Sequence, residues 1–315
     1  MELGLRSGLF QAIADRPGGL SAEELATHLG YDPLYTAVWC RSAFGAGLLD
    51  RSYGDRYLLA PHLETILLNP DAPSYLGGFV RVMAGMRETF TDLREFLRTG
   101  QREWWCDMSP EWISAVGDAG QSFYRRMLNL AVPQLPAVET TLNGGGIVLD
   151  LACGVCKGPA KVAAAYPDTS FVAIDGDAYT LEAAGQYLRE QCLDERFQLM
   201  HSPLEDLDLD RVADLAIINI SLHEARDIRR VVANVQQALR PGGTFLINEF
   251  PFPETIDGCR TLPAQIMSGI QFFEAHIGCQ LLPASRFVKF LQEQGFHDVA
   301  AINLTPVHAV IHGRA

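Results

Sequence analysis

The sequence predicts an α/β protein with a doubly wound, mostly parallel sheet of seven strands, preceded by a smaller helical domain. Apolar strand-like segments alternate with helical ones after residue 140, and the turn after the first of these strands is rich in small residues. The first 90 residues follow a different, mainly helical pattern. Strands alternating with helices favour a parallel sheet covered on both faces. The length of 315 residues also exceeds what one hydrophobic core usually supports.

Seven segments of residues 141–315 have the composition of buried strands. They are Ile147–Leu151, Ser170–Asp175, Phe197–Met200, Ala213–Asn219, Gly243–Glu249, His297–Asn303 and Val307–Ile311. Doubly wound sheets bind their ligands beyond the carboxyl ends of the strands. We therefore expect the functional residues of this domain to follow directly after strands.

Residues 1–90 are expected to form three helices and a hairpin, which is the order of a winged helix. The helices are predicted from apolar spacing, a capping box at Ser21 to Glu24 and a glycine stop, and the hairpin from strand-like residues around Gly54. The predicted helices are Leu5–Ala14, Ala22–His28 and Pro33–Phe44. Residues 91–140 are predicted to be a helical, aromatic-rich segment that links the domains and contributes to a substrate pocket.

Composition argues against several classes of protein. The formal net charge is −13 and the chain contains three lysines, so no basic cluster is available to bind a nucleic acid backbone. No run of 18 apolar residues and no export signal is visible, so we expect neither a membrane span nor secretion. The seven scattered cysteines then read as reduced thiols in the cytoplasm.

A turn of small residues follows the first strand. The segment reads Val148-Leu-Asp-Leu-Ala-Cys-Gly-Val-Cys-Lys-Gly158, and its small residues let the chain turn tightly while a ligand approaches the backbone. Asp150, near the strand end, can accept hydrogen bonds from a cationic amine. The second strand ends in Asp175, where dinucleotide folds place an acid that binds ribose hydroxyls. The loop lacks two glycines of the NAD-binding pattern Gly-x-Gly-x-x-Gly.

These residues resemble the class I S-adenosylmethionine-dependent methyltransferases, which have a Rossmann-like sheet. In that family an acid precedes Gly-x-Gly-x-Gly. Asp150 and Gly154 match, Ala152 is a small substitute, and Cys156 replaces the last glycine. Leu239-Arg-Pro-Gly-Gly243 resembles the family's turn into its fifth strand. The resemblance covers about residues 140–315 and implies S-adenosyl-L-methionine as cofactor. The implied cofactor-binding residues are Asp150, Ala152, Cys153, Gly154, Asp175, Gly176, Ser202, Pro203, Leu204 and Asn219.

The segment after the fourth strand contains the candidate general base. A hydroxyl acceptor of a methyl group must lose its proton, and a neutral histidine at the carboxyl end of a strand can accept it. His223 has this position, and Glu249 at the end of the next strand can hold its other ring nitrogen. Leu222-His-Glu224 resembles the signature of the dimeric winged-helix O-methyltransferases, which implies catalytic roles for His223, Glu224 and Glu249. That family's second bracketing acid aligns with Leu281, so the sequence predicts an incomplete set.

The same resemblance implies an aromatic acceptor pocket and a homodimer. The expected pocket residues lie on helices before and after the sheet: Trp104, Trp105, Trp112, Phe123, Tyr124, Met127, Phe272 and Phe273. The expected dimer surface is apolar and belongs to the first 90 residues, with Leu5, Leu9, Phe10, Tyr35, Val38 and Trp39. O-methylation of a small aromatic or natural-product molecule is therefore the leading hypothesis.

Other functions remain open at this level. Members of the fold also methylate carbon or nitrogen, or hold the cofactor without transferring its methyl group. A winged-helix transcriptional regulator is disfavoured, because the segment Pro33–Phe44 carries a single cation, Arg41. No metal is expected, since Cys153-x-x-Cys156 has no second cysteine or histidine pair close by in the sequence.

Overall fold

The computed structural model describes the backbone of residues 1–315 and every side chain except those of residues 87–92. The chain forms two compact units, Met1–Gly85 and Met86–Ala315. The boundary lies inside helix α5 (Gly77–Thr99), and the aromatic-rich segment 91–140 falls within the second unit. The predicted boundary between residues 90 and 91 falls within residues 87–92, whose side chains the structure does not describe.

The first unit contains four α-helices, a short hairpin and a helical turn, in the order that the sequence predicts. These are α1 (Glu2–Arg6), α2 (Leu9–Ala14), α3 (Ala22–Leu29), α4 (Pro33–Gly45), β1 (Leu49–Ser52), β2 (Arg56–Leu59) and η1 (Glu64–Leu68). The single helix predicted over Leu5–Ala14 is wrong, because Gly8 adopts φ 68° and breaks it into two. The capping box is present, with Ser21 and Glu24 each bonded to the other's backbone N–H.

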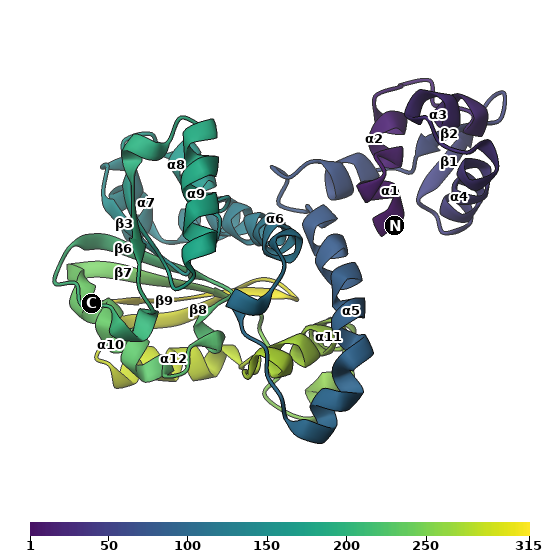
Figure 1. The fold of residues 1–315 in the computed structure, drawn as a ribbon. Coiled ribbons are helices and arrows are strands. Elements are labelled where there is room, and N and C mark those ends of the chain that lie inside the picture. Colours follow the sequence, from purple (N-terminus) through teal and green to yellow (C-terminus); the bar gives the residue numbers. More distant parts are fainter. The chain divides into compact units, whose positions relative to one another are not determined.

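The second unit alternates helices and strands (Figure 1). After α5 and the turn η2 (Trp105–Asp107), its α-helices are α6 (Pro110–Arg126), α7 (Pro136–Asn143), α8 (Pro159–Ala165), α9 (Ala178–Glu190), α10 (Ile228–Ala238), α11 (Leu262–Ile277) and α12 (Ala284–Glu293). Its strands are β3 (Ile147–Leu151), β4 (Ser170–Asp175), β5 (Phe197–His201), β6 (Ala213–Asn219), β7 (Leu239–Glu249), β8 (His297–Thr305) and β9 (His308–Arg314).

The seven strands form one sheet in the order β5-β4-β3-β6-β7-β9-β8. Strands β3 to β7 pair in parallel, and β9 runs antiparallel to both β7 and β8. The predicted seven-stranded, doubly wound sheet is confirmed. The chain order reverses between β3 and β6, so the carboxyl ends of these two strands flank the crevice where such sheets bind ligands.

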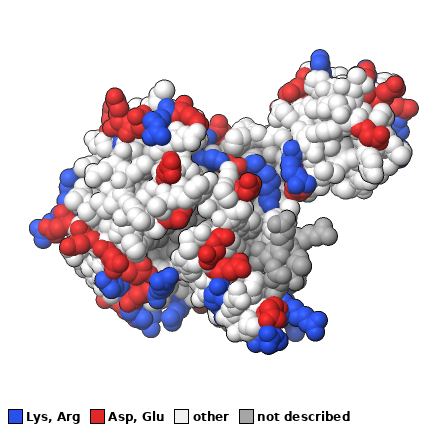
Figure 2. Space-filling view, viewed as in Figure 1, with Lys and Arg blue, Asp and Glu red and all other residues white. Residues whose placement is uncertain are grey.

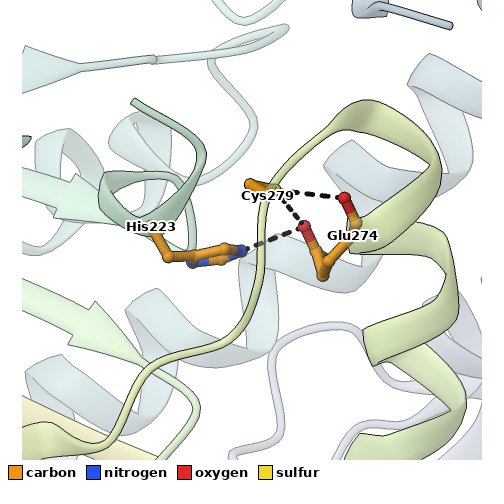
Figure 3. A group of neighbouring side chains, drawn as sticks. All are labelled: His223, Glu274 and Cys279. Carbon is orange, nitrogen blue, oxygen red and sulfur yellow. Dashed lines mark hydrogen bonds and ion pairs between the residues drawn. The ribbon is translucent and has the colours of Figure 1, made fainter. Parts of the chain in front are cut away.

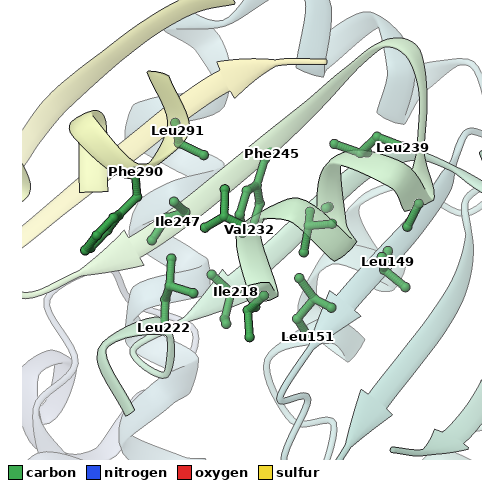
Figure 4. Packing of buried hydrophobic residues seen from close by; sticks show 14 of the residues in the cluster. Leu149, Leu151, Ile218, Leu222, Val232, Leu239, Phe245, Ile247, Phe290 and Leu291 are labelled. Carbon is green, nitrogen blue, oxygen red and sulfur yellow. The ribbon is translucent and has the colours of Figure 1, made fainter. Parts of the chain in front are cut away.

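Successive residues of the central strands pack into separate cores on the two faces of the sheet. Leu149 and Leu151 of β3 contact a cluster that contains α10 and α12, which Figure 4 shows from close by. Val148 belongs to the opposite cluster, built from α6, α7 and α8. This alternation is the period of two that a buried strand requires. It leaves Asp150 on the α6 side of β3, buried but polar.

Among the described side chains, charged groups lie mostly at the surface, but Arg126, Asp150, Glu249 and Glu274 are buried. On the face seen in Figure 2, acidic and basic residues are interspersed. Within the described part of the chain, no helix is both long enough and apolar enough to cross a bilayer.

Candidate active site

The turn after β3 adopts left-handed backbone conformations at alternate positions. Ala152, Gly154 and Cys156 have φ of 52°, 56° and 58°. These are the three positions at which the family motif has glycine, the residue that adopts such angles without strain. Ala152 and Cys156 bear a strain that glycine would avoid, of about 1 to 2 kcal/mol each. The turn therefore keeps its shape although two of the three glycines are replaced.

Asp175 holds this turn in place. Its Oδ2 accepts a hydrogen bond of 2.9 Å from the backbone N–H of Gly154, and its Oδ1 accepts one of 3.0 Å from Asp177. The backbone N–H of Cys153 also donates to the carbonyl of Ile174, at 2.9 Å. Burial raises the pKa of the Asp175 carboxyl, while the backbone N–H donors oppose that rise. Each carboxylate oxygen retains capacity to accept a further hydrogen bond, such as one from a ribose hydroxyl.

Asp150 is completely buried and pairs with Tyr124. The Tyr124 hydroxyl lies 3.0 and 2.8 Å from the two carboxylate oxygens. Burial raises the pKa of both groups, and the mutual contact raises that of the tyrosine further. Tyr124 also packs on Gly158, where an added Cβ would lie 2.3 Å from its ring. Tyr124, which was predicted to line the acceptor pocket, covers the turn after β3 in the structure and is not grouped with the pocket tryptophans.

The remaining predicted cofactor residues lie at the ends of β4, β5 and β6. Gly176 follows β4, and its carbonyl lies 3.0 Å from Nε2 of His201. Ser202 follows β5, where its N–H donates to the carbonyl of Asp175 at 3.0 Å. Pro203 and Leu204 lead from there into the turn η6 (Leu204–Asp206). These residues form one edge of the sheet with the turn after β3.

Two observations test whether this edge fits the implied cofactor. Oδ1 of Asn219, at the end of β6, is buried and has no hydrogen-bond partner among the described residues. A buried acceptor of this kind calls for a donor, and the ammonium group of S-adenosylmethionine is one. A Cβ added to Gly154 would meet no atom within 4 Å, so there is open space beside the turn. Asp150, Gly154, Asp175 and Asn219 therefore fit the group.

His223 is buried at the carboxyl side of β6, in the turn η7 (Leu222–Glu224). Its Nδ1 lies 2.9 Å from both carboxylate oxygens of Glu249, the last residue of β7. The backbone N–H of His223 donates to the same carboxylate at 3.3 Å. The sequence predicted that these two residues meet, and the structure brings them together. Glu249 thus fixes Nδ1 as the protonated nitrogen and leaves Nε2 for other partners.

A second acid, which the sequence prediction missed, faces the other side of the imidazole. Oε2 of Glu274, on α11, lies 3.2 Å from Nε2 of His223, although Nε2 makes no aligned hydrogen bond. Burial by itself would lower the pKa of His223, but the carboxylates of Glu249 and Glu274 outweigh it and hold that pKa well above its ordinary value. Figure 3 shows His223, Glu274 and Cys279 turned toward one another. The signal available in the sequence was that Glu274 is the single acid of an apolar helix.

Glu224 is the third acid of the group. Its Oε2 accepts a hydrogen bond of 2.7 Å from the indole Nε1 of Trp105. Burial, followed by the charge of Glu274, raises the pKa of Glu224 to about 8. Three carboxylates therefore surround one imidazole, and the cluster favours occupants that bring a proton or a positive charge.

The eight predicted pocket residues do not form one group. Trp105 and Trp112 pack against Phe273, at ring-centroid distances of 5.9 and 5.0 Å. Trp104 instead lies under the guanidinium of Arg226, at 4.9 Å. Phe123, Met127 and Phe272 do not join either group in the structure. Phe123 packs on Phe250 and His308, Met127 is fully buried in the core beneath α6, and Phe272 is 49% exposed.

Comparison with known proteins agrees with this arrangement. Residues 149–245 match the family model described as a methyltransferase domain. Among curated proteins, the chain is 28% identical over 137 residues to the sterol 24-C-methyltransferase of Debaryomyces hansenii. That match covers 43% of this chain and 36% of the yeast protein. The aligned part thus spans little more than a third of the curated relative.

Solved structures match over the whole chain. An O-methyltransferase family protein from Burkholderia thailandensis superposes with a TM-score of 0.68 at 20% identity, covering 99% of this chain and 92% of the other. Human N-acetylserotonin methyltransferase, solved in complex with S-adenosylmethionine, gives 0.69 at 17% identity, with coverage of 99% and 92%. The second unit therefore has the fold of these methyltransferases, and its residues 149–245 are the part that matches the methyltransferase-domain model. S-adenosylmethionine, which is bound in the human structure, is also the group that Asp150, Asp175 and Asn219 fit in this chain.

Proposed function

We propose that this methyltransferase transfers the methyl group of S-adenosylmethionine to a hydroxyl of a small aromatic or natural-product molecule. The observation that carries the proposal is the pair His223 and Glu249, with Nδ1 held at 2.9 Å by both carboxylate oxygens. Such a pair is suited to accept a proton at Nε2 and to stabilise the resulting imidazolium. Solved proteins of this fold include an O-methyltransferase family protein from Burkholderia thailandensis and a mitomycin 7-O-methyltransferase.

When bound, the cofactor supplies a methyl group already activated on a sulfonium, so the chain's own residues orient the acceptor and remove its proton. His223 takes the proton of the acceptor hydroxyl at Nε2 as the oxygen–carbon bond forms. Glu249 keeps the ring in one tautomer throughout. A positioned general base of this kind contributes about two to four powers of ten in rate.

The aromatic group of Trp105, Trp112 and Phe273 supports an aromatic acceptor. Trp105 links this group to the catalytic segment, because its indole donates to Glu224 next to His223. The indole Nε1 of Trp112 is buried and finds no hydrogen-bond partner among the side chains that are described. A flat acceptor with a polar edge would pack on these rings and supply that partner.

The direct experiment is incubation with methyl-labelled S-adenosylmethionine and a matched panel of phenols, amines and activated carbon acids, followed by mass spectrometry of the products. We expect label on the oxygen of at least one phenol. Calorimetry with S-adenosylmethionine and S-adenosylhomocysteine serves as the control for a folded protein with an intact cofactor site. Cofactor binding with no label on any oxygen in a broad panel would contradict O-methylation.

A carbon or nitrogen acceptor is the second candidate. The observation that favours it is the position of Glu274, whose Oε2 lies 3.2 Å from Nε2 of His223, where an acceptor hydroxyl would have to lie. Transfer to an amine or a carbon nucleophile can proceed without a base at that position. The curated relative named above is a sterol 24-C-methyltransferase. The same labelling experiment separates the two candidates by the atom that carries the label.

We also propose that two chains associate through the first unit. Leu9 and Phe10 were predicted at the dimer surface but are buried in the unit's own core, and Trp39 packs edge-on against Phe10 at 5.2 Å. Helix α4 nevertheless exposes three large apolar side chains on one face, Leu34, Tyr35 and Val38. Such a group on a small domain marks an interaction surface.

A further inference from the structure

We propose that His223, Glu274 and Cys279 form a binding site for one divalent ion of the zinc class, which competes with the proton that His223 accepts. The three residues come from the turn after β6, from α11 and from the segment that follows it (Figure 3). His223 and Glu274 are buried, and Cys279 is partly buried. One ring nitrogen, one carboxylate oxygen and one sulfur lie within 4.8 Å of one another.

The two separations that involve Glu274 are close to those of a tetrahedral site. Oε2 of Glu274 lies 3.2 Å from Nε2 of His223 and 3.1 Å from Sγ of Cys279. Zinc bonds of about 2.1 Å to nitrogen or oxygen and about 2.3 Å to sulfur, at tetrahedral angles, separate their ligands by roughly 3.4 to 3.6 Å. Shifts of a few tenths of an ångström would bring Glu274 and each of its two neighbours to coordination spacing, and the His223 and Cys279 atoms, which lie within 4.8 Å of each other, would have to approach by at most about 1.2 Å.

The tautomer of neutral His223 directs a lone pair toward the proposed ion position. Because Nδ1 is held by both oxygens of Glu249, the lone pair of the neutral ring lies on Nε2. That nitrogen is buried without a hydrogen-bond partner within the described residues, and it faces a carboxylate oxygen and a sulfur. A carboxylate that holds the far nitrogen of a histidine is the usual support of a metal-bound imidazole.

The chemical types of the three ligand atoms indicate which kind of metal ion would bind. Nitrogen, sulfur and a single carboxylate suit zinc and its borderline-soft neighbours, whereas magnesium and calcium require mostly oxygen ligands. Three protein ligands leave a fourth position open for water. On binding, the thiol of Cys279 loses its proton to solvent and any proton on Nε2 is also released. The occupied Nε2 can then no longer accept a proton from a hydroxyl.

Titration of the full-length, chelator-treated and reduced protein with Zn²⁺ tests the site by calorimetry. We expect one ion per chain, no comparable binding of Mg²⁺, and a thiolate-to-metal charge-transfer absorption when Co²⁺ is used instead. Cys279→Ser and Glu274→Gln should each weaken Zn²⁺ binding by more than about tenfold, since even the loss of a residue that only orients a ligand costs about 10- to 100-fold. Cys192→Ser, which removes an exposed thiol elsewhere, should leave the affinity unchanged.

Zn²⁺ binding that survives in both Cys279→Ser and Glu274→Gln would overturn the proposal and would point to Cys153 and Cys156 instead. A Co²⁺ complex without thiolate absorption, or Mg²⁺ binding as tight as Zn²⁺, would also overturn it. Binding of S-adenosylhomocysteine by each variant verifies that it is folded. Binding of Zn²⁺ to these three residues does not depend on the proposed function. Inhibition of methyl transfer by Zn²⁺ does depend on it, because inhibition requires His223 to act as the base. Site-specific Zn²⁺ binding without loss of methylation would support the ion site and contradict the role of His223 as base.

Discussion

The hydroxyl of Tyr124 on α6 lies within hydrogen-bonding distance of both carboxylate oxygens of Asp150 on β3, at 3.0 and 2.8 Å. Both residues are buried, so this contact joins the helix to the strand that begins the cofactor site. A buried carboxylate without a donor is costly, because neither water nor another group replaces the lost hydrogen bond.

Tyr124→Phe should therefore lower the free energy of unfolding by about 1 to 3 kcal/mol. Urea denaturation measures this loss. Tyr179→Phe is the matched control, since the Tyr179 side chain is half exposed on α9 and its change should stay within about 0.5 kcal/mol. Equal effects of the two substitutions would show that the Asp150 contact contributes nothing to stability.

Ala152→Gly should stabilise the protein, although glycine is usually unfavourable. Ala152 has φ 52°, which costs an alanine about 1 to 2 kcal/mol. The greater freedom of glycine in the unfolded chain offsets about 0.4 to 1 kcal/mol of that gain. The net expectation is a rise of about 0.5 kcal/mol. Ala164→Gly, an exposed position on α8, should instead lose about 1 kcal/mol. A loss at both positions would contradict the strain at Ala152.

His308 should make the stability of the second unit depend on pH. Its Nδ1 accepts a hydrogen bond of 3.0 Å from Arg126, and its Nε2 lies 3.1 Å from Oδ1 of Asn248, so the neutral ring is satisfied on both sides. Burial, and then the Arg126 cation, hold the pKa of His308 well below its ordinary value of 6.5. The unfolded chain thus takes up a proton near that value while the folded chain does not.

The contribution of His308 is fully present above pH 6.5 and is lost as the pH falls toward the lower folded pKa. The loss should approach about 1.4 kcal/mol per pH unit below pH 6. The measurement is the unfolding free energy of the wild type minus that of His308→Gln, at pH 8 and at pH 5.5, because the difference cancels the other histidines. A difference that does not change with pH would rule out a neutral, buried His308.

The proposed dimer makes a prediction about α4. Tyr35 and Val38 are 79% and 45% exposed, and glutamate at both positions would place two charges in an apolar interface. We expect light scattering to report a dimer for the wild type and a monomer for Tyr35→Glu/Val38→Glu. Tyr53→Glu, at the more exposed tip of the β1–β2 hairpin, should remain dimeric. A monomeric wild type at micromolar concentration would refute the proposal.

Much of the fold could be predicted from the sequence, because buried parallel strands and their small-residue turns leave local patterns. The meeting of His223 and Glu249 was predictable for the same reason, since both follow neighbouring strands. Glu274 could not be found this way. The family resemblance puts Leu281, in the segment after α11, at the position of the second acid and so predicts that this acid is missing, whereas the structure supplies an acid from α11 itself. A helix can present a carboxylate to a given point from several sequence positions, so spacing along the chain does not determine it.

The grouping of the predicted pocket aromatic residues could not be read from the sequence either. Trp105, Trp112 and Phe273 come together from η2, α6 and α11, which no local pattern relates. Phe123 and Met127 lie on or directly after α6 as well, but they point toward the sheet and fill its core. Composition alone does not distinguish a pocket aromatic from a core one.

The central claim is that His223 removes the acceptor's proton, and its most direct test is the rate of methyl transfer to a series of phenols of rising acidity. We predict that His223→Ala is slower by about two to four powers of ten with the least acidic phenol and that the loss shrinks as the phenol becomes more acidic. Affinity for S-adenosylhomocysteine should remain unchanged. Near-full activity of His223→Ala across the series, with no dependence of the loss on acceptor acidity, would contradict the account.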